Sequence, residues 1–352
     1  MIVQAGDFAD MVATTLQELG ENKWTDLATD YQSTHILKRF IPDNKATLKA
    51  GYEIRFQVMT DTSGSAAHRG LGYTVTPNVV AVMDSGEVPW RRMNWTWAWE
   101  HDLIAMNRAP RRIVEFIKTQ RIAALKAAAV EFEIKAWRAP ALANTEDPYG
   151  IPYYVVKSNT MVTTNDGFNG SVPSGHSSVA GLSPTTYQRW KNYATQYTAV
   201  TFDDLVRKMR RAYAKTGFKP IVSGEPTYAK GSKGYQIFVN YATLAPFEEL
   251  LRTQNENLGN DLASKDGLTT FRRTDVEWVV ELDDDTTNPC YGLCLDDWDV
   301  VGLSDRWMVE TTFNELPTQP TMGYTNTHCS YNYVCRNRRR QWVLATDTSM
   351  PA

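Results

Sequence analysis

The feature that most constrains the fold of this chain is one uninterrupted helical segment at residues 110–137. Pro110 suits a first helical turn, and no further Gly or Pro occurs before Pro140. One face carries the apolar residues Ile113, Ile117, Ala124, Leu125, Ala128 and Phe132. At 1.5 Å per residue, the helix is about 42 Å long. A helix of this length is long for a compact domain.

A β-rich segment at residues 47–100 directly precedes this helix. Tyr52, Ile54, Phe56 and Val58 alternate with polar or exposed positions, and Trp95, Trp97 and Trp99 do the same later. A polar stretch rich in Gly and Ser separates the two patterns at 60–72, and residues 73–83 are a further strand candidate. A long hairpin with no core of its own is marginal by itself. It needs a surface to lie on, either a neighbouring subunit or the rest of this chain.

The other predicted elements give a mixed α+β chain. Helices are expected at 6–31, 201–216 and 244–256. Thr201 is the expected N-cap of the second of these helices, and Gly217 its stop. Strands are expected at 220–223, 235–240, 276–282, 291–301, 306–313, 329–336 and 339–345, with a turn at 230–234. No repeat occurs at a fixed period, which excludes a solenoid.

Composition excludes several classes of protein. The 352 residues are 42% apolar and 22% charged, as in ordinary globular proteins, and the formal net charge is −3. A freely diffusing nucleic-acid binder is usually basic, so this charge argues against that class. No apolar run is long enough for a bilayer, and the N-terminus does not read as a signal peptide. The 11 Trp and 17 Tyr residues fit either a large core or large protein interfaces.

The groups that could bind a metal ion are spaced unlike known metal sites. The four cysteines have spacings of C-x3-C and C-x5-C, so buried thiols are favoured over a zinc site; they are Cys290, Cys294, Cys329 and Cys335. Acidic clusters at 281–285 and 296–299 do not match an EF-hand loop. We expect solvated or salt-bridged loops there, with basic groups of another subunit as candidate partners. No metal and no cofactor is predicted.

No catalytic motif stands out in the sequence. The segment 175–179 comes closest to a nucleophile elbow but lacks its last Gly, and no phosphate-binding glycine motif follows a strand. The strongest charged feature is basic and consists of Arg336, Arg338, Arg339 and Arg340. These side chains could contact DNA phosphates, pair with carboxylates across a subunit interface, or form a solvated or salt-bridged turn. The sequence leaves all three open.

The order of elements, together with several short patterns, resembles one known family. The patterns include Phe168-Asn169-Gly170, Val179-Ala180-Gly181-Leu182, Trp190-Lys191-Asn192, Asn288-Pro289-Cys290-Tyr291-Gly292 and the ending from Tyr331 to Arg340. They resemble the major capsid proteins of tailed bacteriophages, which share the Hong Kong 97-type fold. The resemblance implies five segments: an N-terminal arm at 1–46, an extended β loop (the E-loop) at 47–103, a peripheral domain at 104–200 with its spine helix at 110–137, an axial domain at about 201–300, and a return to the peripheral domain at 301–352.

The resemblance also implies a structural role rather than an enzyme. Many copies would form hexamers and pentamers of an icosahedral shell around double-stranded DNA, with the E-loop lying over the adjacent subunit. A separate scaffolding protein, a portal and a decoration protein are candidate partners, and no membrane partner is implied. The expected location is the virion capsid, assembled in the cytoplasm of a bacterial host. Some relatives crosslink a Lys to an Asn, but neither residue can be aligned here.

Three alternatives remain open at this point. An encapsulin-like nanocompartment shell shares the fold and differs in its cargo. A tail or decoration protein would be another virion component with a different fold. An enzyme would need a pocket of clustered titratable groups with shifted pKa values, and the sequence offers no such cluster.

Overall fold

The computed structural model describes residues 47–60, 68, 71, 82–100, 110–158, 167–217, 234–256, 270–272, 274–311, 314–316 and 319–346. The predicted helical arm at 6–31, the strand at 220–223 and the turn at 230–233 lie outside these ranges. In the described part of the chain, no helix has the length and apolar character needed to cross a membrane.

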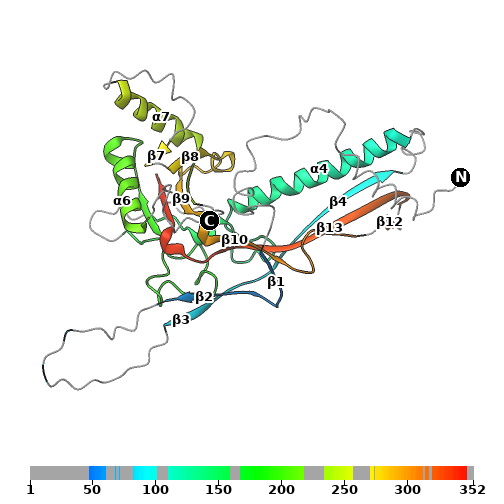
Figure 1. The fold of residues 1–352 in the computed structure, drawn as a ribbon, viewed down its shortest axis with the longest axis horizontal. Coiled ribbons are helices and arrows are strands. Elements are labelled where there is room, and N and C mark those ends of the chain that lie inside the picture. The colour runs from blue at the N-terminus through cyan, green and yellow to red at the C-terminus, as the bar shows by residue number, and fades with distance from the viewer. Residues whose placement is uncertain are drawn as a thin grey trace.

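The long helix α4 (Pro110–Ala136) confirms the central prediction from the sequence. It runs beside the long strands β4 (Arg91–Glu100) and β13 (Gln319–Cys335), and all three elements reach out from the body of the molecule on the same side (Figure 1). The Phe132 ring lies 4.3 Å from the Tyr331 ring, and the Tyr333 hydroxyl donates to the Phe132 carbonyl at 2.7 Å. The buried carboxylate of Glu133 accepts a hydrogen bond from the Trp137 indole at 3.1 Å. These contacts fix the inner end of the helix on the sheet.

The first sheet is built around β13. Its strands run in the order β1 (Thr47–Lys49), β10 (Trp298–Leu303), β13 and β11 (Val309–Glu310), and both β12 (Asn314–Leu316) and β4 also pair with β13. Strand β4 is antiparallel to β13 along its whole length, from Arg91 opposite Tyr331 to Glu100 opposite Met322. The alternating indoles of β4 are all buried, as the period of two predicts.

A two-stranded ribbon projects from the body of the molecule (Figure 1). It consists of β2 (Ile54–Met59) and β3 (Met83–Val88), paired antiparallel from Ile54 opposite Val88 to Met59 opposite Met83. Ile54 and Val88 are fully buried at its base, whereas Met59 and Met83 are exposed at its far end. The strand predicted over 52–58 is therefore confirmed from Ile54 onward, whereas Tyr52 lies in a bend before it and is exposed. Most of the predicted 73–83 strand lies outside the described residues.

The second sheet contains strands from distant parts of the chain. Its order is β5 (Tyr193–Gln196), β14 (Trp342–Ala345), β9 (Cys290–Cys294), β6 (Tyr235–Val239), β8 (Thr274–Trp278) and β7 (Thr270–Phe271). Helices α6 (Arg207–Thr216) and α7 (Tyr241–Glu256) lie beside it (Figure 1). Gly292 stands opposite Trp342 in this sheet, and a Cβ at Gly292 would lie 1.9 Å from the Trp342 ring. Only glycine leaves room for that indole.

The helix predicted at 201–216 forms with the expected caps. It begins as a π-helical turn (Phe202–Val206) and continues as α6. The Thr201 hydroxyl accepts a hydrogen bond from the Asp204 amide at 3.2 Å, and Gly217 ends the helix with φ of 63°. Both residues act as the sequence predicted.

Four strand predictions are wrong in part. The segment 291–301 was expected to be one strand, but the 3-10 turn Leu295–Asp297 divides it into β9 and β10, which belong to different sheets. The segment predicted at 276–282 leaves the sheet after Trp278 and becomes the 3-10 turn Val280–Leu282. Within the described part of the segment predicted at 306–313, strand β11 is limited to Val309–Glu310. The strand predicted at 339–345 begins only at Trp342, after the 3-10 turn Arg338–Arg340. Strand ends depend on pairing partners that lie far away in the sequence.

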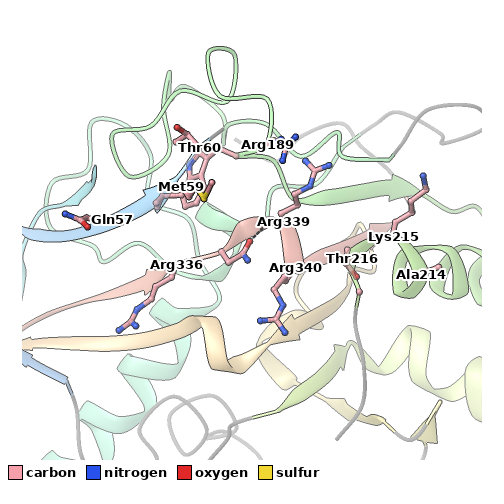
Figure 2. Close-up of a pocket in the computed structure, with 14 residues that line it drawn as sticks. Gln57, Met59, Thr60, Arg189, Ala214, Lys215, Thr216, Arg336, Arg339 and Arg340 are labelled. Atoms are coloured by element: carbon pink, nitrogen blue, oxygen red, sulfur yellow. Dashed lines mark hydrogen bonds between the residues drawn. The ribbon is translucent and has the colours of Figure 1, made fainter. Parts of the chain in front are cut away.

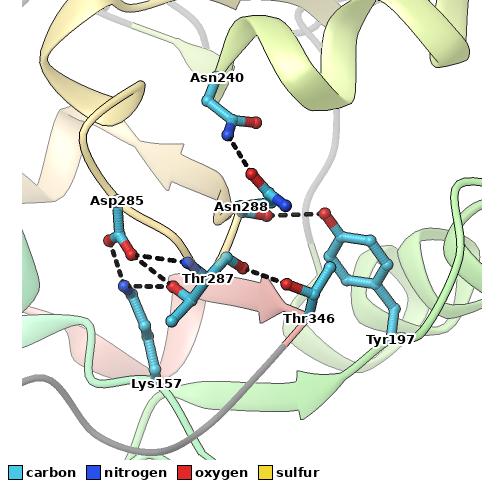
Figure 3. Close-up of polar contacts among 7 residues, drawn as sticks. All are labelled: Lys157, Tyr197, Asn240, Asp285, Thr287, Asn288 and Thr346. Carbon is cyan, nitrogen blue, oxygen red and sulfur yellow. Dashed lines mark hydrogen bonds and ion pairs between the residues drawn. The ribbon is translucent and has the colours of Figure 1, made fainter.

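The position of the C-terminal strand is fixed by polar contacts around residues 285–288 (Figure 3). The Lys157 ammonium forms an ion pair with Asp285 and donates to the Thr287 hydroxyl at 2.7 Å. Thr346 donates to the Thr287 carbonyl through its amide at 2.8 Å and its hydroxyl at 2.9 Å. The acidic cluster at 281–285 therefore supplies a structural ion pair.

Two neighbouring residues complete this network. The Tyr197 hydroxyl donates to the Asn288 carbonyl at 2.7 Å, and the Asn240 amide donates to the Asn288 side chain at 2.6 Å (Figure 3). Asn288 itself has a φ of 43°, a left-handed conformation that asparagine tolerates better than most residues. The turn that precedes β9 is thus held by hydrogen bonds from Tyr197, which follows β5, and from Asn240, which precedes α7.

Candidate functional site

The arginine run connects the two sheets. Strand β13 of the first sheet ends at Cys335, the 3-10 turn Arg338–Arg340 follows, and β14 of the second sheet begins at Trp342. The Asn337 side chain caps the turn by accepting from the Arg339 amide at 3.1 Å. Because the chain turns over residues 336–340, the four arginine side chains point to different places: some reach the surface, and Arg338 reaches the interior.

Arg338 lies in the interior and is fully buried. Its Nε donates to the Tyr154 carbonyl at 2.6 Å, and its terminal nitrogens donate to the carbonyls of Trp190 and Ser171, each at 2.8 Å. A further contact joins it to the Asn192 side chain at 3.3 Å. Burial lowers the pKa of Arg338 to about 10, which still leaves the guanidinium protonated at neutral pH. Arg338 therefore binds its own chain and cannot contact DNA or another subunit.

Arg336 and Arg340 pair with the second acidic cluster. Arg336 lies 2.5 Å from the Asp299 carboxylate, and Arg340 lies 3.5 Å from the Asp297 carboxylate. Burial raises the pKa of Asp297, and the charge of Arg340 offsets part of that rise. Arg340 also donates to the Tyr235 hydroxyl. Of the three roles that the sequence left open for these arginines, the two ion pairs agree with a salt-bridged turn.

A groove opens where the arginine turn meets the ribbon and α6 (Figure 2). Its cavity volume is about 660 Å³. The far end of β2, from Gln57 to Met59, forms one border, and the C-terminal end of α6 forms another. The basic residues that line it are Arg189, Lys215, Arg336, Arg339 and Arg340. No Asp or Glu is among its lining residues.

A second depression of about 300 Å³ adjoins this groove. It shares Arg189 and Arg339 with the groove and adds Lys191. The Arg339 guanidinium lies 3.9 Å from the centre of the Phe168 ring, a cation–π contact that holds it over this depression. We call the two depressions together the basic groove.

Three of the six basic residues that line the basic groove had been singled out in the sequence. Arg336, Arg339 and Arg340 were singled out and do line the basic groove, whereas Arg338 does not. Arg189, Lys191 and Lys215 were missed as site residues because they lie more than 100 positions away along the chain. No pattern around Arg189 distinguishes it from an ordinary surface arginine. Only the pairing of β14 beside β5 brings it to the arginine turn.

The chemistry of the basic groove is that of anion recognition. It has several guanidinium groups, which bind carboxylates and phosphates in a planar, bidentate manner. Among the described residues no group of three or more metal-ligating side chains occurs. The four cysteines are buried free thiols, as predicted, and burial raises the pKa of each.

Comparison with solved structures identifies the fold. Neither a protein-family model nor a curated protein matches the chain. The capsid asymmetric unit of cyanophage A-1(L) is similar with a TM-score of 0.63 and 14% identity, covering 94% of this chain and 98% of that one. The capsid of a native GTA particle is similar with a TM-score of 0.55 and 9% identity, covering 94% and 96%. The holo-SrpI encapsulin of Synechococcus elongatus PCC 7942 is similar with a TM-score of 0.52 and 10% identity, covering 96% and 97%.

These matches extend over nearly the whole length of each chain. The protein therefore has the fold of tailed-phage major capsid proteins, an α+β fold that an encapsulin also has. This confirms the fold that the order of elements in the sequence indicated.

Proposed function

We propose that this chain is the shell-forming subunit of a phage-type capsid, assembling as hexamers and pentamers into an icosahedral shell around double-stranded DNA. The observation that carries the proposal is the similarity to the A-1(L) capsid, at a TM-score of 0.63 over 94% of this chain. A likeness over nearly the whole chain leaves little of it for an added catalytic domain. The absence of carboxylates from the basic groove fits a binding surface better than an acid–base site.

In this proposal the sheets define the domains. The ribbon β2–β3 is the base of the E-loop, and α4 with the first sheet is the peripheral domain. The second sheet, α6 and α7 form the axial domain. This division assigns β5 (Tyr193–Gln196) and β14 (Trp342–Ala345) to the axial domain, whereas the sequence-based boundaries placed them in peripheral segments. Residues 1–46 remain the proposed N-terminal arm.

The surface of the ribbon supports a role in contacts between subunits. Met59 and Met83 pair at its far end and are 63% and 57% exposed. Large apolar side chains exposed side by side mark an interaction surface. A neighbouring copy would cover them in the shell.

Electron microscopy of the purified protein tests this proposal. Rings or closed particles built from five- and six-fold units support it. The expected partners are many copies of the chain itself, packaged DNA without sequence preference, and separate scaffolding, portal and decoration proteins. The expected location is the virion capsid, assembled in the cytoplasm of a bacterial host.

An encapsulin-like shell is the second candidate, because the SrpI encapsulin has the same fold at a TM-score of 0.52. The contents of shells purified from their natural source separate the two. Nuclease-protected DNA supports the capsid, whereas an encapsulated protein supports the nanocompartment.

A further inference from the structure

Three cations share the smaller depression of the basic groove. Arg189 is exposed and forms no hydrogen bond or ion pair with a described residue. Lys191 donates to the neutral Gln188 side chain at 2.8 Å and forms no ion pair in the described part of the chain. Arg339 lies over the Phe168 ring, which holds its guanidinium in place. Because no described carboxylate lines this depression, its cations attract an anionic partner.

Arg336 and Arg340 differ from these three cations. They pair with Asp299 at 2.5 Å and with Asp297 at 3.5 Å, so carboxylates of the chain itself offset their charge. Figure 2 shows that they point to one side of the arginine turn, whereas Arg189 and Arg339 point to the other. The charge that a partner can reach therefore lies on the side of Arg189, where the two depressions meet.

The smaller depression offers little apolar surface to a protein partner. Phe168 is the one apolar side chain among its described lining residues, and it already contacts the Tyr193 ring and the Arg339 guanidinium. The remaining lining side chains are amides or cations. Interfaces between proteins have an apolar core, whereas interfaces with DNA are more polar and much more positively charged. The lining therefore suits a phosphate backbone better than a protein surface.

We infer that the basic groove contacts the phosphate backbone of double-stranded DNA through Arg189, Lys191 and Arg339. The inference rests on the proposed shell function and specifies the surface of the subunit that meets the packaged DNA. Contacts of Arg and Lys with phosphates hold a protein on a duplex without reading its sequence. Each copy in a shell meets a different stretch of DNA, so only contacts of this kind can form at every copy.

The rest of the chain keeps this contact weak in a single subunit. The formal net charge is −3, so the subunit as a whole is not attracted to DNA at long range. A few phosphate contacts give an affinity that falls steeply as salt is added. Weak contacts that are repeated over many linked copies nevertheless hold a long polymer collectively.

Removal of two of the cations tests the contact. The groove variant carries Arg189→Gln and Lys191→Gln, and its binding to a short labelled DNA duplex is measured by fluorescence anisotropy at several salt concentrations. At low salt we expect its dissociation constant to be at least about tenfold higher than that of the native chain. The slope of log affinity against log salt should become shallower by about 2, because each lost phosphate contact contributes about 0.9. Duplex binding equal to that of the native chain would overturn the inference.

A control variant loses the same charge at another place. It carries Arg92→Gln and Arg306→Gln, and both arginines are exposed and line neither depression. It should bind the duplex with the affinity and the salt dependence of the native chain. Circular dichroism of both variants establishes that they are folded. If the control loses as much affinity as the groove variant, binding follows net charge alone and the inference is overturned.

Two other occupants of the groove give different results. If inorganic triphosphate binds the native chain and the duplex does not, the groove is a pocket for free phosphates and the inference is overturned. If the groove variant binds the duplex normally but assembles only at a higher protein concentration, the groove is a contact between subunits and the inference is again overturned.

The inference and the proposed function can fail separately, because duplex binding and shell formation are measured by different methods. Shells in electron micrographs without DNA binding that depends on the groove overturn the inference alone. DNA binding that depends on the groove, in a chain that forms no shell at any concentration, overturns the proposed function and leaves a DNA-binding surface in a protein of another kind.

Discussion

At the scale of single residues, the arginine run separates into side chains with opposite roles. Arg338 donates to carbonyl oxygens in the interior and is fully buried, whereas Arg336 is half exposed beside Asp299. Sequence reasoning could not tell them apart because adjacent letters carry no information on which side of a turn each residue faces. The charge of the run could be predicted, but its division into core and surface required the structure.

Replacement of Arg338 should be far more damaging than replacement of its neighbour. Arg338→Ala leaves several buried acceptors without donors, and each such loss costs about 1–3 kcal/mol. We expect the free energy of unfolding to fall by about 3–5 kcal/mol in urea titrations followed by tryptophan fluorescence. Arg336→Ala is the matched control, because the Arg336 side chain is 54% exposed and its single ion pair is screened by solvent, so the change should cost less than about 1 kcal/mol. Equal losses in both variants would contradict the buried role of Arg338.

Asp204 should make stability depend on pH in the acid range. Burial raises its pKa, but the Lys208 ammonium and hydrogen bonds from Thr198 and Ala199 outweigh that effect and hold the pKa well below the ordinary value. A depressed carboxyl pKa stabilises the folded state above the unfolded-state pKa, near 4, and the gain is lost as pH falls below it.

The variant Asp204→Asn tests whether Asp204 stabilises the fold at neutral pH and loses this effect in acid. At pH 7 it should unfold with a free energy lower by about 1–3 kcal/mol than the native chain. The difference should shrink as the pH is lowered from 4 toward 2, as measured by urea titrations at each pH. A difference that stays constant across this range would show that Asp204 does not titrate as described.

At the scale of elements, some helices and strands could be predicted from the sequence and others could not. The spine helix and β4 were predicted because their periodicities are long and unbroken, and the 201–216 helix because Thr201 and Gly217 mark its ends. The 291–301 segment misled because only the three-residue 3-10 turn Leu295–Asp297 separates its two buried strands. Its division depends on partners in two sheets, which lie far away in the sequence.

The stability of helix α4 should depend on its inner end. Phe132 is buried against Tyr331, so Phe132→Ala should lower the free energy of unfolding by about 3–5 kcal/mol. Leu125 lies on the same helix and is 45% exposed. Leu125→Ala should therefore change the free energy by less than about 1 kcal/mol in the same urea titration. A comparable loss at both sites would mean that the helix packs differently.

The ribbon should matter for assembly rather than for folding. Met59→Ser combined with Met83→Ser replaces the exposed apolar side chains at the far end of the ribbon, so the melting temperature should stay within about 2 °C of the native value. Half-maximal assembly should need at least a tenfold higher concentration in light scattering. Met308→Ser, also at an exposed apolar residue, is the control and should assemble normally. Normal assembly of the ribbon variant would contradict a role of the ribbon between subunits.

At the scale of the whole molecule, two sheets share one chain through three crossings. The chain passes from the first sheet to the second between β4 and β5, returns to the first between β9 and β10, and passes to the second again at the arginine turn between β13 and β14. The basic groove forms at the last of these crossings, beside the far end of β2. A site assembled in this way is spread over the sequence from residue 57 to residue 340. Sequence patterns therefore indicated the class of protein more clearly than the composition of the site.

The central claim is that this chain builds a shell from copies of itself. Cryo-electron microscopy of the purified native chain over a range of concentrations tests it most directly. We predict five- and six-fold rings or closed particles, with the ribbon of each subunit resting on its neighbour. A chain that remains a discrete monomer or dimer at every concentration would contradict it.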